Sequence, residues 1–240
     1  MPKRTYLITG ASKGIGLATA KQLAAAGHDV IGLARTQPAD GFPGNFVSVD
    51  LADRQQSHEV IEKLAEQYEI DGILNNVGLV NPARLEDITL EDFDAVIDVN
   101  LRVAIQVTQA ALPNMRAKRW GRIVNTSSLV TVGVPFRTSY AAAKSGLISF
   151  TRSWALELAK DGITVNAVAP GPVATELFNT NNPPGSESRQ RYIESIPMNR
   201  TGTPEEIAAA NCFLLGEDST FITGQTIYVD GGSSIGHAPV

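Results

Sequence analysis

The sequence predicts an α/β fold in which one parallel sheet of seven strands is covered by helices on both faces. Short runs rich in β-branched residues alternate with longer amphipathic segments, and no linker, repeat or low-complexity tract interrupts the alternation. Strands that alternate with helices are joined by right-handed crossovers, which produce a doubly wound parallel sheet. With 240 residues, 43% of them hydrophobic, the chain (1–240) is predicted to form a single domain.

Each strand is predicted from its apolar, β-branched composition, and each helix from apolar residues that recur on one face. The predicted strands are residues 5–8, 29–33, 45–49, 72–74, 122–126, 164–168 and 226–229. The predicted helices are residues 14–26, 54–67, 90–115, 140–160 and 204–215. Ligands bind such folds at the carboxyl ends of the strands, so we expect the functional residues in the loops that follow them.

Two connections depart from the regular alternation. Residues 36–44 hold two prolines and two glycines, and a parallel crossover normally takes a dozen or more residues. We therefore expect an abbreviated loop without a helix between the second and third strands. Residues 176–203 are rich in Asn, Pro, Gly and Ser, and a loop of that length is usually functional or disordered. We expect a substrate loop there, with a passive loop as the alternative.

Composition narrows the class of protein. The formal net charge of -5 argues against a general nucleic-acid binder. No apolar run approaches the roughly 20 residues that span a bilayer, and the N-terminal segment lacks the pattern of a signal peptide. The single cysteine, Cys212, excludes an internal disulfide and lies in an apolar helical segment, where we expect packing rather than nucleophilic chemistry. These features predict a cytoplasmic protein without membrane, nucleic-acid or metal sites.

The segment after the first strand predicts a dinucleotide-binding loop. Its glycines allow a tight turn and a close approach of the backbone to a pyrophosphate, which then lies at the helix N-terminus. A glycine-rich turn alone is weak evidence, but its place between the first strand and the first helix is typical of the Rossmann fold. The segment reads Thr9-Gly10-Ala11-Ser12-Lys13-Gly14-Ile15-Gly16.

The glycine pattern and further motifs resemble the short-chain dehydrogenase/reductase family over nearly the whole chain. The family pattern Gly-x-x-x-Gly-x-Gly is found at Gly10, Gly14 and Gly16. The other motifs follow in family order and spacing: Asn75-Asn76-Val77-Gly78, Asn100, Ser127-Ser128, Tyr140-x-x-x-Lys144, Pro170-Gly171-Pro172-Val173-Ala174-Thr175, and a closing segment at 224–232. Val77 stands where the family usually has alanine.

The resemblance implies an oxidoreductase whose catalytic residues are Asn100, Ser128, Tyr140 and Lys144. In the family the tyrosine is the acid or base, and the lysine lowers its pKa and holds the nicotinamide ribose. The serine orients the carbonyl, and the asparagine supports a water relay to the lysine. The spacing of the residues is consistent with these roles, since Tyr140 and Lys144 are four positions apart and therefore lie on one helical face. A phenol titrates near pH 10, so a nearby positive charge is needed for work at neutral pH.

Structural roles compete with these assignments. If each residue is considered alone, Tyr140 is explained as an aromatic side chain at the start of a helix and Lys144 as a solvated charge on it. Because the two occur together in a chain that also has the glycine loop, they indicate catalysis. The family shows its serine at both spacings from the tyrosine. We choose Ser128, the second of the pair, and Ser127 then caps the strand end. Asn100 is alternatively a buried polar group that bonds the backbone.

The end of the second strand indicates NADP(H), with NAD(H) as the alternative cofactor. NAD-selective folds place an acid there to bond the ribose 2′-hydroxyl, whereas an arginine accommodates a 2′-phosphate. In this chain Ala34 stands at the position of that acid, and Arg35 follows it. Lys13 matches the basic residue of NADP-dependent family members. The structural alternative is that both cations are simply hydrated. Asp50, after the third strand, resembles the family's adenine contact or caps the next helix.

The resemblance assigns cofactor contacts to loops after several strands. They are Gly10, Ser12, Lys13, Gly14, Ile15, Gly16, Arg35, Asp50, Leu51, Asn76, Val77, Gly78, Tyr140, Lys144, Pro170, Gly171, Val173 and Thr175.

We therefore expect an NADP(H)-dependent carbonyl reductase or alcohol dehydrogenase, similar to 3-oxoacyl-carrier-protein reductases, that acts on a small-molecule or carrier-bound carbonyl. One alternative is an NAD-dependent alcohol dehydrogenase. The other is a non-enzymatic redox sensor, a class that typically loses the Tyr or the Lys. Enoyl reductases of this scaffold have six residues between the Tyr and the Lys rather than three.

The motifs do not encode the substrate. Val134, Phe136 and Phe178 are expected to face it and favour an apolar body beside the carbonyl. A cationic segment could dock an acidic carrier, although such a run is more often a solvated face. It comprises Arg116, Lys118, Arg119 and Arg122.

A homotetramer is expected because two long helices are apolar on more than one face. Apolar surface that does not pack on the sheet should be covered by a neighbouring subunit. In the family these helices form a four-helix interface and the last strand a second one, which gives dihedral symmetry. The alternative is a monomer with well-buried helices. The residues concerned are Val99, Val103 and Val107 on the first helix and Leu147, Phe150 and Trp154 on the second.

Overall fold

A computed structural model describes residues 2–236 of the chain, so Met1 and residues 237–240 of the predicted domain lie outside the described part. All seven predicted strands are present in one parallel sheet of order β3-β2-β1-β4-β5-β6-β7. The order reverses between β1 and β4, which is the topological switch point of a doubly wound fold. The predicted fold class is confirmed. The strands are β1 (Thr5–Thr9), β2 (Asp29–Ala34), β3 (Asn45–Ser48), β4 (Gly72–Asn75), β5 (Gly121–Thr126), β6 (Ile163–Pro170) and β7 (Thr226–Val229).

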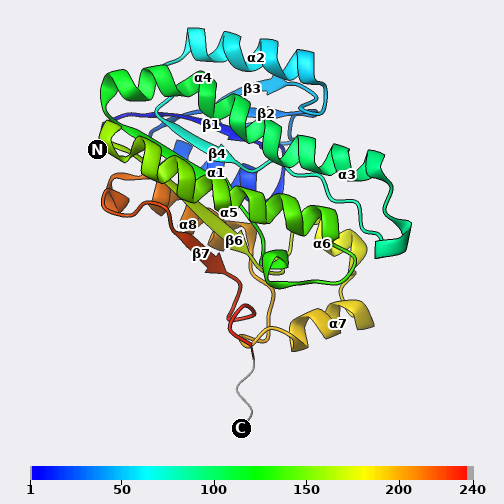
Figure 1. Ribbon diagram of the computed structural model, residues 1–240. Coiled ribbons are helices and arrows are strands. Elements are labelled where there is room, and N and C mark those ends of the chain that lie inside the picture. Colours follow the sequence, from blue (N-terminus) through cyan, green and yellow to red (C-terminus); the bar gives the residue numbers. More distant parts are fainter. Residues whose placement is uncertain (1, 237–240) are drawn as a thin grey trace.

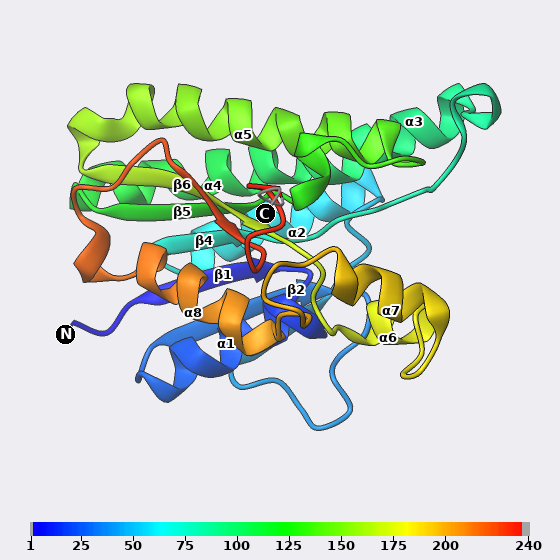
Figure 2. The same cartoon turned by 90° about the horizontal axis from the view of Figure 1, so that it is seen from below.

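Helices cover both faces of this sheet (Figures 1 and 2). On one face lie α1 (Gly14–Ala25) and α8 (Pro204–Leu215), which contact each other. On the other lie α2 (Arg54–Gln67), α4 (Val103–Lys118) and α5 (Thr138–Leu158), with α3 (Leu90–Ile97) leading into α4. Parallel strands buried on both faces require continuous apolar runs, and β5 and β6 are buried along their whole lengths.

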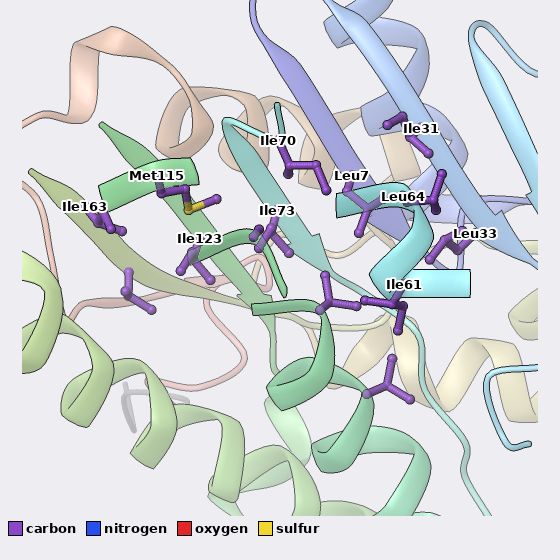
Figure 3. Packing of buried hydrophobic residues seen from close by; sticks show 14 of the residues in the cluster. Leu7, Ile31, Leu33, Ile61, Leu64, Ile70, Ile73, Met115, Ile123 and Ile163 are labelled. Carbon is purple, nitrogen blue, oxygen red and sulfur yellow. The ribbon is translucent and has the colours of Figure 1, made fainter. Parts of the chain in front are cut away.

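Two apolar clusters fill the space between the sheet and its helices. The cluster beneath α2, α4 and α5 includes Leu7, Ile73 and Ile123 from the sheet, and Figure 3 shows how they converge with Ile61 and Met115 of the helices. A second cluster beneath α1 and α8 contains Leu23 and Leu214. Together they hold the carboxyl ends of the strands at one edge of a rigid scaffold.

The predicted helix 90–115 is wrong in its continuity. It divides into α3, one π-helical turn at Asp98–Arg102, and α4. A π turn holds one more residue than an α turn, which shifts the side chains that follow it. Asn100 lies in this turn, where its Nδ2 donates to the backbone oxygens of Val96 (2.8 Å) and Leu79 (2.9 Å). A tertiary contact with the loop after β4 therefore accompanies the irregularity.

The structure also corrects the expectation that residues 176–203 are irregular. The segment contains α6 (Glu176–Asn181) and α7 (Glu187–Glu194), which lie beyond the carboxyl end of β6 (Figure 1). Thr175 and Ser186 cap the two helices by accepting hydrogen bonds from backbone N–H groups of the first turns. In contrast, residues 36–44 form no helix, as predicted.

Candidate active site

A cavity of about 610 Å³ opens at the carboxyl ends of the strands near the switch point. Many of the predicted cofactor contacts line it, namely Gly10, Ser12, Lys13, Arg35, Asp50, Leu51, Asn76, Val77 and Gly78. Of the others, Gly14, Ile15 and Gly16 begin α1. Nine of the eighteen predicted contacts thus line one cavity, although they come from loops far apart in sequence, whereas Tyr140, Lys144 and the predicted contacts at and after the end of β6 do not line it.

The glycine loop turns sharply between β1 and α1. A Cβ at Gly16 would lie 2.3 Å from the Gly10 carbonyl oxygen, so no larger residue fits at that position. The Asn76 side chain ties the loop to the end of β4, because its Nδ2 donates to the backbone oxygens of Thr9 (3.2 Å) and Gly10 (3.1 Å). The N-terminus of α1 is therefore held beside the cavity, where its free N–H groups favour an anion.

Two cations stand at the β2 side of the cavity. Lys13 and Arg35 line it with exposed side chains, and neither forms an ion pair within residues 2–236. Asp50 lines the same cavity, and its Oδ1 accepts a hydrogen bond from the Ala52 backbone N–H. The alternative that Asp50 caps the next helix is wrong, since Asp53 caps α2.

The segment after β6 closes the cavity near α1. Pro170 ends β6, Gly171 donates its N–H to the Val229 oxygen (3.1 Å), and Val173 pairs with Gly202. Thr175 packs against the first turn of α1, because a Cβ at Gly14 would lie 3.2 Å from its Cγ2. Glu176, which follows Thr175, also lines the cavity; the sequence analysis did not assign it to the cofactor site, because only its position at the start of the expected substrate loop marks it.

Tyr140 and Lys144 lie on the same face of α5, with the Lys144 Nζ 5.5 Å from the centre of the Tyr140 ring. Lys144 is fully buried, and its Nζ donates a hydrogen bond to the Thr126 carbonyl oxygen at 2.8 Å. Burial disfavours the charged amine and lowers the pKa of Lys144 to about 7. Near neutral pH this amine therefore exchanges between its charged and neutral forms.

The pKa of Tyr140 differs from the expectation. Burial raises it to about 12, and the hydrogen bond from Ser128 and the charge of Arg137 offset only part of that rise. The implied lowering by Lys144 is thus absent in the protein alone, because the buried amine has itself lost much of its charge. At pH 7 the phenol is protonated, which is the form that donates a proton.

The two candidate serines occupy different places. Ser127 is buried and donates its hydroxyl hydrogen to the Lys144 backbone oxygen (3.0 Å). Ser128 accepts a hydrogen bond from the Val130 N–H (3.3 Å), and its side chain lies close enough to the Tyr140 hydroxyl to lower the pKa of that phenol. The structure thus brings Ser128, rather than Ser127, against the phenol.

Asn100 shares a space with Lys144 beside Gly78. A Cβ at Gly78 would lie 3.1 Å from the Asn100 Oδ1 and 3.5 Å from the Lys144 Nζ. Within the described residues the buried Oδ1 accepts no hydrogen bond. The alternative role of Asn100, a buried polar group that bonds the backbone, therefore holds for its Nδ2, whereas its Oδ1 lies beside Gly78, as does the Lys144 Nζ.

Several other predicted residues are placed by the structure. Val134 and Phe136 are exposed in the loop before α5. Phe178 packs its ring against Tyr192, with ring centres 5.5 Å apart, and so joins α6 to α7. Cys212 is partly buried against the cluster beneath α8, and burial raises the pKa of its thiol to about 12. Cys212 is therefore a packing residue.

The cationic segment lies at the other end of the sheet, where α4 ends and β5 begins. Arg116 pairs with Asp161 (2.9 Å) and Lys118 with Asp71 (2.8 Å). Arg122 is buried, with its guanidinium 4.4 Å from the centre of the Trp120 ring. Since acidic and aromatic neighbours of the same chain occupy these side chains, the segment is not a free cationic surface near the cavity of its own chain.

Neither a membrane-spanning nor a metal-binding feature is found between residues 2 and 236. No helix there has the length and apolarity needed to cross a bilayer. No group of His, Cys, Asp and Glu side chains in that range is arranged to hold a metal ion.

A glycine-rich turn at the switch point, two cations beside it and a Tyr–Lys pair on α5 are the arrangement expected of an oxidoreductase that uses a dinucleotide. The comparisons with known proteins give its family. A family model described as enoyl-(acyl carrier protein) reductase matches residues 10–234. The chain belongs to the short-chain dehydrogenase/reductase family and is an oxidoreductase of the CH–OH/C=O pair.

Among its relatives, a 3-oxoacyl-[acyl-carrier-protein] reductase of Thermotoga maritima is 42% identical over 95% of this chain and 97% of its own. The protein of the same description from Escherichia coli is 36% identical over 94% and 95%. A solved structure from Beutenbergia cavernae with bound NADP at low occupancy has a TM-score of 0.90, with 33% identity and 96% of both chains covered. Levodione reductase has a TM-score of 0.89, with 30% identity and 98% of both chains covered.

Proposed function

We propose that the chain is an NADP(H)-dependent reductase of ketones, with a 3-oxoacyl group on a carrier protein as the leading substrate class. The contact of Ser128 with the protonated phenol of Tyr140 carries the proposal, because it places a proton donor beside a carbonyl-orienting hydroxyl. The alternative, an NAD-dependent alcohol dehydrogenase, uses the same residues in the opposite direction. The non-enzymatic alternative is not favoured, since Tyr140 and Lys144 are both kept.

The residues present fit a nicotinamide dinucleotide. The close approach of Gly16 to Gly10 leaves backbone N–H groups of the α1 N-terminus beside the cavity for a pyrophosphate. Arg35 and Lys13 suit a 2′-phosphate, and Lys144 with Asn76–Gly78 would hold the nicotinamide ribose side. When bound, NADPH supplies the hydride.

In this reaction Tyr140 donates its hydroxyl proton to the carbonyl oxygen while the carbonyl carbon accepts the hydride. The C=O π bond breaks, and a C–H and an O–H bond form. Ser128 holds the carbonyl oxygen in line with the phenol. Lys144, with a pKa of about 7, then restores the proton of Tyr140, and the Oδ1 of Asn100 offers an acceptor on the same path. General acid catalysis of this kind is worth about 10²–10⁴ in rate.

A panel of carbonyl compounds tests this function. Purified protein is mixed with NADPH or NADH and with 3-oxoacyl-carrier protein, a short 3-oxoacyl thioester, or a simple cyclic ketone, and nicotinamide absorbance is followed. We expect oxidation of NADPH to be fastest with the carrier-bound substrate. Faster turnover with NADH would support the NAD-dependent alternative, and no turnover of any carbonyl would contradict the reductase.

The segment 176–203 is proposed to be the substrate loop, because α6 and α7 stand at the carboxyl end of β6 beside the cavity that Glu176 lines. We also propose a cytoplasmic location, as expected for a protein with one partly buried cysteine.

We still propose a homotetramer, but exposed apolar side chains now support it in place of the buried valines. Val99, Val103, Val107 and Leu147 are buried within the chain and so belong to the faces of the two helices that pack inside it. Leu156 on α5 is 84% exposed and Phe221 before β7 is fully exposed. Phe150 and Trp154 stack with ring centres 5.0 Å apart and are only half-buried. These side chains lie at α5 and near β7, the two contacts that dihedral symmetry would use.

We expect light scattering at micromolar concentration to give about four times the 25.6 kDa of one chain. Leu156→Arg should lower that mass by placing a charge in the contact made by α5, while Lys63→Arg serves as a surface control. A wild-type mass near 25.6 kDa would contradict the tetramer.

A further inference from the structure

The connection between β2 and β3 forms one wall of the cavity. Four consecutive residues, from Thr36 to Ala39, line it directly after Arg35. In Figure 2 this connection is the blue loop that bulges out on the α1 side of the sheet. A crossover helix normally occupies such a connection, so the wall here is made by a loop.

Little besides one aromatic side chain attaches this loop to the sheet. Among the described residues, the stretch from Thr36 to Gly41 makes a single backbone hydrogen bond, from the Gly41 N–H to the Pro38 oxygen (3.0 Å). No side chain of this stretch is hydrogen-bonded to another described residue. Loops with few hydrogen bonds and few buried contacts open locally at low cost in free energy.

Phe42 provides the attachment. A Cβ at Gly32, in the middle of β2, would lie 2.5 Å from the Phe42 Cζ and 2.8 Å from its Cε2, so the ring lies directly on the strand. The ring is partly buried and packs against the apolar cluster beneath α1 and α8, and its centre is 5.5 Å from that of Phe46 on β3. Phe42 therefore occupies the face of β2 that the missing crossover helix would otherwise cover.

We propose that Phe42 is a positioning residue for the cofactor: seated on Gly32, it fixes residues 36–41 as the wall beside Arg35 and thereby sets the affinity for NADP(H). This role rests on the proposed function. Ordering a loop at the moment of binding costs affinity, and an anchor that orders it beforehand removes that cost. Phe42 itself does not line the cavity, so it acts through the loop.

The test compares Phe42→Ala with a variant that is destabilised elsewhere in the same cluster. Leu23→Ala is the matched control, since Leu23 is buried in that cluster near the far end of α1. Dissociation constants for NADPH and NADH are measured by fluorescence titration, together with thermal stability. We expect Phe42→Ala to raise the NADPH Kd about tenfold, Phe42→Leu to restore most of the affinity, and Leu23→Ala to leave it unchanged.

Limited trypsin digestion gives a second readout that needs no cofactor. Cleavage after Arg35 reports opening of the loop, so Phe42→Ala should be cut there faster than Leu23→Ala. Gly32→Ala, whose Cβ would push the Phe42 ring off the strand and would also lie 2.9 Å from the Ala11 Cβ, is used for this digestion only, and it should be cut after Arg35 as fast as Phe42→Ala.

Wild-type NADPH affinity in Phe42→Ala, or an equal loss in Leu23→Ala at the same melting temperature, would overturn the role of Phe42. If Phe42→Ala does not fold, trypsin cleavage of Gly32→Ala decides the question: cleavage after Arg35 faster than in Leu23→Ala supports the anchor, and an equal rate overturns it. If the wild-type protein binds neither NADPH nor NADH, it is the proposed function that fails.

Discussion

Replacing Tyr140 by phenylalanine should reduce kcat by about 10²-fold or more while leaving the NADPH Kd within about twofold of wild type. The change removes one hydroxyl, which is the proposed proton donor beside Ser128. The ring remains in place near Lys144, so cofactor binding should persist. Single-turnover absorbance and fluorescence titration measure the two quantities separately.

Tyr68→Phe is the matched control for this variant, because it deletes the same atom at the surface, where the Tyr68 hydroxyl accepts a hydrogen bond from Asn45. It should keep wild-type kcat. If Tyr140→Phe retained more than about a tenth of the wild-type kcat, the proton would have to come from another group.

Replacing Arg35 by alanine should weaken NADPH binding far more than NADH binding. Arg35 lines the cavity without an ion pair among the described residues, so a 2′-phosphate would be its charged partner. One charge-assisted hydrogen bond of about 2 kcal/mol corresponds to a roughly thirtyfold rise in the NADPH Kd. NADH carries no 2′-phosphate, and its Kd should change little.

Arg152→Ala, which removes an exposed cation from α5, controls for the general loss of positive charge. It should leave both dissociation constants unchanged at the same ionic strength. Equal losses of NADPH and NADH affinity in Arg35→Ala would mean that Arg35 supports the shape of the loop rather than the phosphate.

The sequence predicts the scaffold well because each strand of a buried parallel sheet must be apolar along its length. Where the hydrophobic pattern predicts the wrong secondary structure, a tertiary contact accounts for the difference. The apolar residues of 90–115 repeat without interruption, so nothing in the pattern marks the π turn at Asn100, which bonds the backbone of a distant loop. The caps Thr175 and Ser186 are visible as residue types, but the helices after them are too short for a recognisable period.

Burial explains the remaining differences within the site. A tyrosine and a lysine four residues apart predict a shared face, yet their pKa values depend on how much water the fold leaves around them. Likewise, Val103 and Val107 look as suitable for an interface as for a core, and only the packing of α4 against the sheet shows that they are core residues. The packing of Phe42 on Gly32 could not be predicted from the sequence, because the two residues belong to different elements.

The buried amine of Lys144 has a consequence for how the fold responds to protons. Its pKa in the folded chain is about 7, against an ordinary 10.5. Between these two values the unfolded chain binds a proton that the folded chain does not, so raising the pH through this window stabilises the fold. Below pH 7 the folded chain must carry a desolvated charge, and any ligand oxygen that accepts a hydrogen bond from Nζ offsets that cost. Acidic conditions should therefore increase the free energy of unfolding that such a ligand adds when it binds.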